Sequence, residues 1–591
     1  MNILGISCYY HDAAASLLRD GELIAAAEEE RFSRKKHDFG FPKGAIQFCF
    51  DQGGISAQDL DFVVFYEKPF EKFERILMTT LQTFPKSWKV FRESMITWLV
   101  DKLWIRHHIE HELGVPKDKV LFTQHHLAHA ASAFLVSPFD EAAILTVDGV
   151  GEWATATYGT GKGNEINLFK EIRFPHSLGL LYSAFTAFLG FEVNEGEYKV
   201  MGMAPYGEPR YVDKVWKLVQ QHDDGSFSLD MDYFCFHHST TRMYSRKFEQ
   251  LFGDPRPPET YFFTESTGFP SYFGEKPGNF GELCKLNQHY ADLAASIQKV
   301  TEEVILGMAK YVRRETGLKS LCIAGGVGLN SVANGRILKE SGFENLYIQP
   351  AAGDGGGALG AALHACHSML GHPRKHVMRH AYWGQSFSNG EVEDYLKSEG
   401  ISYSRRDDED QLINDTVDAL KDGKVIGWYQ GRFEWGPRSL GNRSILADPS
   451  REEMKDVVNT KIKFREPYRP FAPSILSEEA ENYFDLPGAA QHDPARFMLL
   501  VAPVLEEKQA SIPAITHVDG TGRLQTVFEE TNSLYYNLIK QFGQASGVPV
   551  LLNTSFNLRG EPIVTTPANA YSTFMRSEMD MLVLGNHIVL K

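Results

Sequence analysis

A weak internal repeat constrains the fold of this chain more than any other feature of its sequence. The segment Ile3-Leu-Gly-Ile-Ser7 is followed by Asp12-Ala-Ala-Ala-Ser-Leu, and Ile144-Leu-Thr-Val-Asp148 is followed by Trp153-Ala-Thr-Ala-Thr-Tyr. Each copy predicts a strand, a turn of the type that approaches phosphate, and a second strand. Chance similarity between two buried strands is the alternative. We interpret the two segments as an internal repeat.

A glycine-rich segment follows these two copies along the chain. Leu321-Cys-Ile-Ala-Gly325-Gly-Val-Gly-Leu-Asn330 comes after a helix-like stretch at residues 291–314. Gly325 and Gly326 would let the backbone approach a ligand closely, although such a cluster alone is a weak signal. The chain order of these motifs resembles the duplicated actin-like ATPase fold that sugar kinases and heat-shock ATPases share. The motifs are the strand–turn–strand segments, the strand that ends in Asp148, and this loop.

A pair of histidines predicts a metal site. On a helix, His125 and His129 stand at positions i and i+4, so both imidazoles can reach one ion, whereas His126 would point about 100° away and is predicted to be structural. Asp148 ends an apolar run, and Asp354 lies in a second Gly-rich segment. A packed or solvated histidine is the common alternative. Two imidazoles and two carboxylates suit iron, zinc or manganese, and ligand type alone does not separate these metals.

Length and composition exclude several classes of protein. The 591 residues exceed what one hydrophobic core supports, so we expect two or three domains. A formal charge of −16 argues against a nucleic-acid partner. The six cysteines are scattered without a disulfide framework or CxxC pair, which is typical of a reducing compartment. The N-terminus predicts a strand rather than a leader, and no uninterrupted run of eighteen apolar residues exists. We therefore expect a soluble cytoplasmic protein without a membrane partner.

Residues from about 66 to 118 are aromatic-rich and helical in pattern. We interpret them as an insertion that shapes a wall of the substrate site. Their Trp and Phe side chains are predicted to be core residues rather than a cofactor-binding box.

After residue 367 the pattern of predicted elements changes, because a connector there leads into a new alternation of strands and helices. We place the domain boundary between residues 370 and 371. Lys461, Lys463, Arg465 and Arg469 form a cluster of cations in an otherwise acidic chain, and aromatic and proline residues interleave with them. A solvated charged face is the alternative. The interleaving favours a partly buried basic pocket that holds phosphates by charge-assisted hydrogen bonds.

Two later segments could complete this pocket. Arg523 adds another cation beside a glycine turn, and Val548-Pro-Val-Leu-Leu-Asn553-Thr-Ser555 predicts a buried strand that ends in small polar groups. Because side chains alternate along a strand, Asn553 and Ser555 would project from one side of it. A strand that ends in polar residues is often only a turn, but this one lies in a region already rich in cations.

With these motifs in order, the chain resembles the NodU/CmcH family of O-carbamoyltransferases over nearly its whole length. The motifs that carry the resemblance are His11-Asp12, His125-x-x-x-His129, Asp148-Gly, Gly196-Glu-Tyr-Lys, Gly325-Gly-Val-Gly-Leu-Asn, Gly353-Asp354-Gly, Gly436-Pro-Arg438, the Lys463 to Arg469 run and Asn553-Thr-Ser555-Phe-Asn. The resemblance implies an α/β protein with a duplicated actin-like domain at residues 1–370 that binds the metal and transfers carbamoyl groups. It implies a YrdC-like α/β domain at residues 371–591 that forms carbamoyl-adenylate from ATP and carbamoyl phosphate.

The same resemblance implies a role for each candidate site residue. Metal ligands would be His125, His129, Asp148 and Asp354, with iron preferred and zinc or manganese as alternatives. Catalytic roles would fall on His11 as general base and on Lys463, Arg469 and Ser555. Contacts with the nucleotide and carbamoyl phosphate are expected from Gly325, Gly326, Asn330, Arg438, Lys463, Arg469, Arg523, Asn553 and Ser555. Magnesium would accompany ATP, and the carbamoyl group would pass to a hydroxyl of a small natural product.

Two other functions stay open at this point. An actin-like phosphotransferase would use the same ATP cleft to phosphorylate a hydroxyl, but it would not need the histidine pair or a second basic domain. A non-catalytic nucleotide switch would keep the glycine loops without a metal and a base. The sequence does not identify the acceptor alcohol or the oligomeric state.

Overall fold

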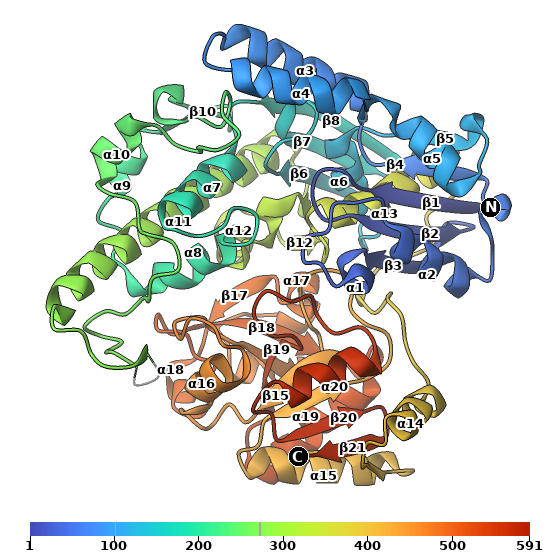
Figure 1. Ribbon diagram of the computed structural model, residues 1–591, viewed down its shortest axis with the longest axis vertical. Coiled ribbons are helices and arrows are strands. Elements are labelled where there is room, and N and C mark those ends of the chain that lie inside the picture. Colours follow the sequence, from blue (N-terminus) through green and yellow to red (C-terminus); the bar gives the residue numbers. More distant parts are fainter. Residues whose placement is uncertain (101, 271–272) are drawn as a thin grey trace. The chain divides into compact units, whose positions relative to one another are not determined.

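The computed structural model describes residues 1–100, 102–270 and 273–591 and has the expected mixed α/β fold (Figure 1). By its internal contacts the chain forms two compact units. The first contains Met1–Tyr9, Leu18–Gly21 and Ser56–Lys375, and the second contains Tyr10–Leu17, Glu22–Ile55 and His376–Lys591. A domain boundary at residue 370 stays a prediction. In the described residues, no helix is both long and apolar enough to cross a membrane.

Two five-stranded sheets have the same topology. The first has the order β3-β2-β1-β4-β5 and the second the order β12-β11-β6-β7-β8. Their strands are β1 (Asn2–Ser7), β2 (Ala14–Arg19), β3 (Glu22–Glu28), β4 (Phe62–Phe65), β5 (Val120–Phe122), β6 (Glu141–Val147), β7 (Ala154–Lys162), β8 (Glu165–Arg173), β11 (Ser320–Ala324) and β12 (Asn345–Ile348). When each set is numbered in chain order, both sheets read 3-2-1-4-5. The central strand pairs in parallel with the fourth in both, as β1 with β4 and β6 with β11. The duplication predicted from the sequence is therefore confirmed.

Equivalent helices follow the fifth strand of each sheet. α6 (His125–Phe134) follows β5, and α13 (Asp354–Leu363) follows β12. Both are rich in alanine or glycine, and they pack against each other. A Cβ atom on Gly360 would overlap the carbonyl oxygen of Ala128, so this glycine lets the two backbones approach closely. Each helix begins with one of the predicted metal ligands.

The insertion between β4 and β5 is helical, as expected, and contains α3 (Pro69–Gln82), α4 (Trp88–Val100) and α5 (Ile105–Leu113). The prediction that its aromatic residues form core is wrong for several of them. Trp98 is buried, but Phe70 is 72% exposed and Trp88 is 57% exposed. The error arises because aromatic content indicates burial only where a neighbouring element covers the helix, and the sequence does not show which face is covered.

A 37-residue helix, α11 (Phe280–Thr316), packs against the second sheet of the first unit. Three further helices, α7 (Leu178–Phe188), α8 (Glu197–Met203) and α12 (Ser331–Glu340), pack against α11. The helix expected at residues 291–314 lies within α11. α11 ends at Gly317, which has a φ of 69°, a conformation that glycine adopts without strain.

The second unit is built on a nine-stranded sheet of order β13-β21-β20-β14-β15-β19-β16-β18-β17. The strands are β13 (Ser404–Arg405), β14 (Ile426–Tyr429), β15 (Arg443–Ala447), β16 (Ala472–Leu476), β17 (Leu500–Pro503), β18 (Thr521–Val527), β19 (Val550–Ser555), β20 (Met581–Leu584) and β21 (His587–Leu590). Its helices include α1 (Glu30–Ser33), α2 (Lys43–Gly53), α14 (Asn389–Ser398), α15 (Glu409–Lys421), α19 (Ser533–Ser546) and α20 (Pro567–Met575). α15 and α19 pack together over a buried core that contains Trp428, Tyr535 and Leu551.

Candidate functional site

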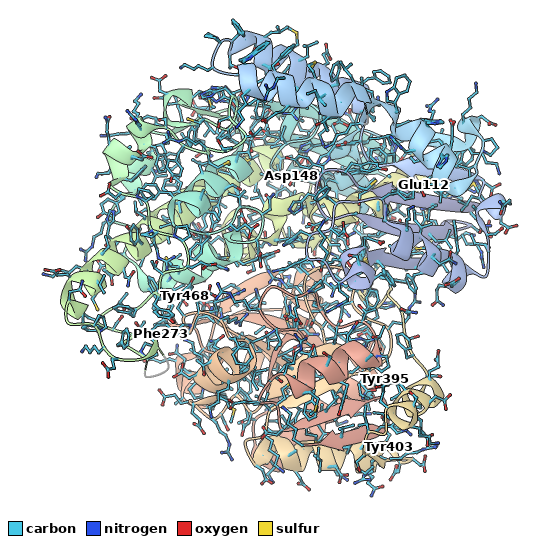
Figure 2. The ribbon with its side chains drawn as sticks, in the orientation of Figure 1. Glu112, Asp148, Phe273, Tyr395, Tyr403 and Tyr468 are labelled. Carbon is cyan, nitrogen blue, oxygen red and sulfur yellow. The ribbon has the colours of Figure 1, made fainter. Side chains whose placement is uncertain are left out.

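The four predicted metal ligands form one buried cluster in the first unit, and Figure 2 marks Asp148 among them. Their donor atoms all lie within 4.8 Å of one another. Nε2 of His125 lies 3.0 Å from Oδ2 of Asp148 and 3.1 Å from Nε2 of His129. Oδ1 of Asp354 lies 3.7 Å from both imidazole nitrogens. Two ligands that are each about 2.1 Å from a shared ion are separated by roughly 3.0 to 3.4 Å, so this donor set fits a divalent metal ion.

Backbone contacts hold the two histidines and Asp148 in place. The amide of Gly326 donates to Oδ1 of Asp148 at 2.8 Å, which leaves Oδ2 directed at the histidines. Gly325 has a φ of 93°, and a Cβ atom there would overlap the carbonyl oxygen of Val147. The glycines predicted to approach a phosphate therefore approach the end of β6. Their contact with a nucleotide stays a prediction.

Two neighbours of the cluster gave no signal in the sequence. Oε1 of Glu152 accepts a hydrogen bond from the backbone amide of His125 at 3.0 Å and thereby caps the start of α6. The hydroxyl of Tyr66 donates to Oδ2 of Asp354 at 3.4 Å. Both residues become recognisable only when distant segments of the chain are brought together.

The electrostatics of the cluster show how strongly its members interact. Burial by itself would lower the pKa of His129, but its hydrogen bonds with Asp148 and Asp354 outweigh burial and raise the pKa to about 9. Burial would raise the pKa of Asp148, but His125 and His129 hold it well below its usual range. The Asp148 carboxylate thus stays available as an anionic ligand.

His126 does not belong to the cluster, in agreement with the sequence-based expectation. Its Nε2 donates to the carbonyl oxygen of Ala154 at 2.9 Å, so its Nδ1 accepts from the hydroxyl of Thr146 at 2.6 Å. Burial lowers the pKa of His126 well below its ordinary value. The ring is therefore a neutral packing residue.

In the second unit, the side chain of Lys463 reaches Ser555, the last residue of β19. Its ammonium group donates to the carbonyl oxygen of Ser555, to Oγ of Ser555 at 3.1 Å and to Oδ1 of Asn557 at 2.6 Å. The side chain is buried at 3% exposure. The structure thus brings together two of the predicted catalytic residues that are 92 positions apart, and it adds Asn557, whose role the sequence did not indicate.

Further cations surround this lysine. Burial, and then the charges of Arg465 and Arg469, lower the pKa of Lys463 well below its usual value. Burial and Arg469 also lower the pKa of Arg465, and Arg523 adds a smaller effect of the same sign. Oε2 of Glu466 lies 3.9 Å from Arg469 and offsets part of this charge. We call Lys463, Arg465, Arg469 and Arg523 the cation cluster. Such an excess of positive charge favours binding of an anion.

Asn553 and Ser555 occupy alternate positions of β19, so they face one side of the sheet as predicted. Asn553 is fully buried, and its Nδ2 lies within hydrogen-bond distance of three acceptors: the carbonyl oxygen of Ser439 at 3.2 Å, and Oγ of Ser474 and Oε1 of Gln525, both at 3.0 Å. These contacts tie β19 to β16 and β18. A direct contact of Asn553 with a ligand stays a prediction, as does that of Arg438, which is half-buried.

Asn330 and His11 occupy different settings. Oδ1 of Asn330 caps α12 by accepting a hydrogen bond from the backbone amide of Ala333 at 3.2 Å. The contact of Asn330 with a nucleotide stays a prediction. His11 lies in the second unit, where its Nδ1 is 2.7 Å from Oδ2 of Asp12. Nδ1 of His37 is 2.7 Å from Oδ1 of the same carboxylate. The sequence indicated His11 and Asp12 as a motif, but it gave no reason to add His37.

The backbone conformation and the pKa shifts of this histidine–aspartate–histidine group show that its three side chains are fixed by one another. Asp12 and His37 have φ values of 42° and 52°, which cost about 1 kcal/mol or more per residue outside glycine. Burial would raise the pKa of Asp12, but hydrogen bonds with His11 and His37 hold it below its usual range. Burial would lower the pKa of His37, but Asp12 raises it. Asp12 is therefore a carboxylate that orients two imidazoles.

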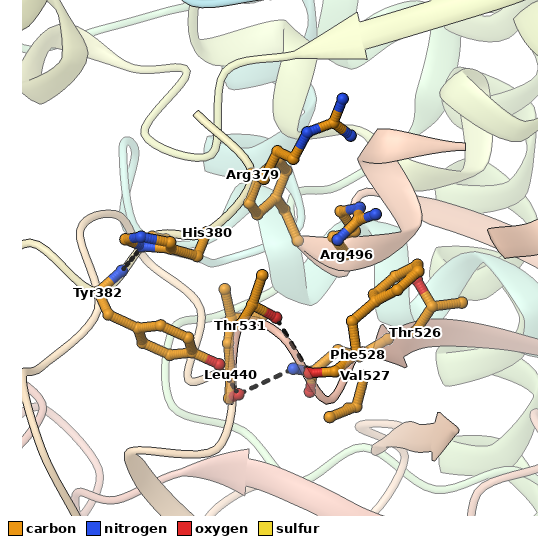
Figure 3. Close-up of a pocket in the computed structure, with 12 residues that line it drawn as sticks. Arg379, His380, Tyr382, Leu440, Arg496, Thr526, Val527, Phe528 and Thr531 are labelled. Atoms are coloured by element: carbon orange, nitrogen blue, oxygen red, sulfur yellow. Dashed lines mark hydrogen bonds between the residues drawn. The ribbon is translucent and has the colours of Figure 1, made fainter. Parts of the chain in front are cut away.

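A small hollow lies in the second unit beside β18 (Figure 3). Among its lining residues, the hydroxyl of Tyr382 donates to the carbonyl oxygen of Leu440 at 2.8 Å. The guanidinium of Arg496 lies 3.4 Å from the centre of the Phe528 ring and pairs with Asp493 at 3.2 Å. The sequence gave no signal for this hollow, because its residues come from four separate segments.

Comparison with known proteins finds a matching family model for the N-terminal part of the chain and another for the C-terminal part. A family model described as the carbamoyltransferase N-terminus matches residues 2–363, and one described as the carbamoyltransferase C-terminus matches residues 417–591. An uncharacterised protein of Synechocystis is 48% identical, with 100% of this chain and 97% of that protein covered. The nodulation protein NolNO of Sinorhizobium fredii is 37% identical over 99% of this chain and 79% of that protein.

A relative with a named activity extends the comparison. The 3′-hydroxymethylcephem-O-carbamoyltransferase of Streptomyces clavuligerus is 28% identical, with 98% of this chain and 96% of that enzyme covered. Among solved structures, HypF of T. kodakarensis aligns with 63% of this chain and 48% of its own at 14% identity and a TM-score of 0.29, which is too weak to carry an argument. The two family models span most of the sequence, and the chain therefore belongs to the NodU/CmcH family of carbamoyltransferases and is an enzyme.

Proposed function

We propose that this carbamoyltransferase is an ATP-dependent O-carbamoyltransferase that works in two steps. In the first step, water releases phosphate from carbamoyl phosphate and leaves carbamate, and a carbamate oxygen then attacks the α-phosphorus of ATP. Carbamoyl-adenylate forms and pyrophosphate leaves. In the second step, a hydroxyl oxygen of the acceptor attacks the carbamoyl carbon, and AMP leaves. The observation that carries this proposal is the cation cluster. It is suited to bind phosphate and is separate from the metal cluster, which consists of His125, His129, Asp148 and Asp354.

The first step is assigned to the second unit. Lys463, Arg469 and Arg523 would bind the phosphates, because a buried excess of cations gains most from an anionic ligand. Lys463 is held by Ser555 and Asn557, so its ammonium group is already positioned before the ligand binds. Preorganised charge of this kind stabilises the charge that develops on a reacting phosphate. Arg438 and Ser555 would complete the contacts, and magnesium would accompany ATP.

The second step is assigned to His11 and the metal cluster. A divalent ion held by His125, His129, Asp148 and Asp354 would polarise the carbamoyl carbonyl and so make its carbon more electrophilic. His11 would accept the proton of the acceptor hydroxyl. Asp12 binds Nδ1 of His11 and thereby favours the tautomer whose Nε2 can accept a proton. Iron is our preferred metal, with zinc or manganese as alternatives that the ligand types also allow.

The acceptor is proposed to be a hydroxyl of a small natural product, because the cephem enzyme that this chain is similar to carbamoylates a hydroxymethyl group according to its name. The absence of a disulfide framework supports a cytoplasmic location. The boundary at residue 370, with transfer before it and adenylation after it, forms part of this proposal.

One incubation tests the proposal against its competitors. The protein is mixed with ATP, carbamoyl phosphate, magnesium and a panel of alcohols, and the products are identified by mass spectrometry. Pyrophosphate, AMP and a product heavier by one carbamoyl group are expected. ADP with a phosphorylated alcohol would instead support a phosphotransferase, and neither pyrophosphate nor ADP would support a nucleotide switch. Omitting carbamoyl phosphate is the control, because it should prevent pyrophosphate release.

A further inference from the structure

The helical insertion presents an apolar surface to solvent. On α3 the exposed stripe contains Phe70, Met78 and Leu81, which are 72%, 42% and 56% exposed. On α4 the stripe contains Ile96 and Leu99, at 62% and 54%, and begins at the exposed Trp88. Figure 1 shows α3 and α4 side by side at the edge of the first unit. Exposed apolar side chains gathered on two neighbouring helices are typical of an interaction site.

The orientation of α3 is the reverse of that expected for a surface helix. Its inner face buries Lys72 and Arg75. Lys72 pairs with Glu67 at 2.5 Å, and the guanidinium of Arg75 lies 4.9 Å from the centre of the Phe174 ring. A helix that buries its cations and exposes its apolar stripe is stable in water only at a cost. A partner that covers the stripe removes that cost.

The two exposed stripes have the same spacing and opposite charges. Phe70, Glu74, Met78 and Leu81 on α3 correspond, eighteen positions later, to Trp88, Arg92, Ile96 and Leu99 on α4. All eight side chains are exposed. In each stripe a bulky apolar residue is followed by one charged residue and then by two apolar residues. The charge is negative on α3 and positive on α4.

We infer that the partner is a second copy of this chain, bound through α3 and α4 as a four-helix bundle. A two-fold axis places α3 of one protomer against α4 of the other, so the same surface serves both sides of the interface. The apolar stripes then bury each other, and Glu74 comes within reach of Arg92 of the second copy. The hairpin is already internally packed, since the Phe73 and Trp98 rings lie 6.0 Å apart inside it.

The charge in the stripe also separates this partner from a lipid surface. Lys86 and Lys89 are exposed near the start of α4 and would suit anionic lipids. However, Glu74 lies in the middle of the α3 stripe, and a carboxylate carried into acyl chains costs several kcal/mol. The second copy instead offers an arginine to this carboxylate. The observations therefore favour a protein interface over a membrane.

Analytical ultracentrifugation of the full-length chain tests the inference. We expect a species of about twice the monomer mass of 66.6 kDa at micromolar concentration. Ile96→Glu and Met78→Glu should each raise the dimer dissociation constant by at least about tenfold, because each would bury a charge in the bundle. Met575→Glu, at an exposed methionine in α20, is the matched control and should leave the mass unchanged. Unchanged circular dichroism and carbamoyl transfer would show that the variants are folded.

Exchanging the charges at positions 74 and 92 tests whether α3 and α4 form the interface. Arg92→Glu alone should weaken the dimer, because two acidic stripes would then face each other, and Glu74→Arg with Arg92→Glu should restore it. A wild-type chain that stays monomeric to about 100 μM would overturn the inference. So would a dimer that Ile96→Glu and Met78→Glu leave intact, or a monomer that co-sediments with vesicles containing phosphatidylserine.

Discussion

The imidazoles of His125 and His129 direct their Nε2 atoms at each other across 3.1 Å, with Asp148 and Asp354 beside them. Two ring nitrogens at this distance need a proton or a metal ion between them and their acidic neighbours. A proton accounts for one contact at a time, whereas an ion satisfies all four donor groups together. This relationship is the structural basis of the first prediction.

Removal of one ligand should empty the metal site. His125→Ala or Asp354→Ala leaves three donors and an incompletely coordinated ion, so we expect metal content to fall at least tenfold and carbamoyl transfer with it. His107→Ala, at an exposed histidine of α5, is the control. Elemental analysis of the purified proteins measures the outcome. Stoichiometric metal in both ligand variants would show that the cluster is only a hydrogen-bonded network.

The two proposed half-reactions should separate by mutation. Lys463→Ala or Arg469→Ala should abolish pyrophosphate release, because these cations are assigned to the phosphates of the first step. His11→Ala should leave pyrophosphate release largely intact and slow transfer about a hundredfold or more, because the base acts only on the acceptor. Lys461→Ala, at an exposed lysine of the same segment, is the matched control.

Parallel assays of pyrophosphate and carbamoylated product measure this separation. The competing explanation is that His11 is a packing residue whose loss lowers both activities through stability. Equal loss of both activities in His11→Ala would support that explanation. Normal pyrophosphate release by Lys463→Ala would contradict the assignment of the first step.

Anion binding should be coupled to proton uptake at Lys463. Its pKa is lowered by burial and by Arg465 and Arg469, so the free enzyme loses this proton well below the usual lysine value of 10.5. A bound phosphate favours the charged form and raises the pKa again, so binding takes up a proton and weakens as the pH rises through the lowered pKa.

Calorimetry of inorganic phosphate binding in two buffers with different ionisation enthalpies measures that uptake. The Lys463→Met variant should bind phosphate more weakly and without the proton contribution. A heat of binding that is the same in both buffers for the wild-type protein would disprove the coupling.

Gly325→Ala should damage the metal cluster through the backbone. The residue has a φ of 93°, and its Cβ atom would overlap the carbonyl oxygen of Val147. We expect a loss of about 1–3 kcal/mol in the free energy of unfolding and weaker metal binding, because Gly326 would no longer orient Asp148. Gly278→Ala, where a Cβ atom meets no neighbour within 4 Å, is the control. Denaturant titration and metal titration of both variants test this.

His37 should act as a positioning residue for His11. His37→Gln removes an imidazole from the shared carboxylate of Asp12, and Asp12→Asn removes the acceptor itself. We expect the kcat of transfer to fall about tenfold or more in both, with pyrophosphate release unchanged. The KM for the acceptor should stay constant, since neither residue is proposed to bind it. A rise in KM without a fall in kcat would assign His37 to substrate binding instead.

The sequence predicted those parts of the molecule whose geometry is local or repeated. His125 and His129 share a helix, so their spacing sufficed, and the repeat at Ile3 and Ile144 correctly predicted two copies of one sheet. Contacts across long stretches were not predictable. His37 meets Asp12 only because the chain returns after 25 residues, and Asn557 meets Lys463 across 94. The exposed stripe of α3 was missed because composition does not reveal which face of a helix is covered.

The metal cluster joins α6 and α13, which are equivalent helices of the two repeats. Each helix follows the fifth strand of its own sheet, and their first residues, His125 and Asp354, are ligands contributed by different repeats. Both helix N-termini carry partial positive charge, so the carboxylates of Asp148 and Asp354 are needed before a cation can bind between them. An ion bound there would cross-link the two repeats, as a structural zinc ion cross-links a small domain. Chelation should therefore loosen the first unit as a whole, and not only its chemistry.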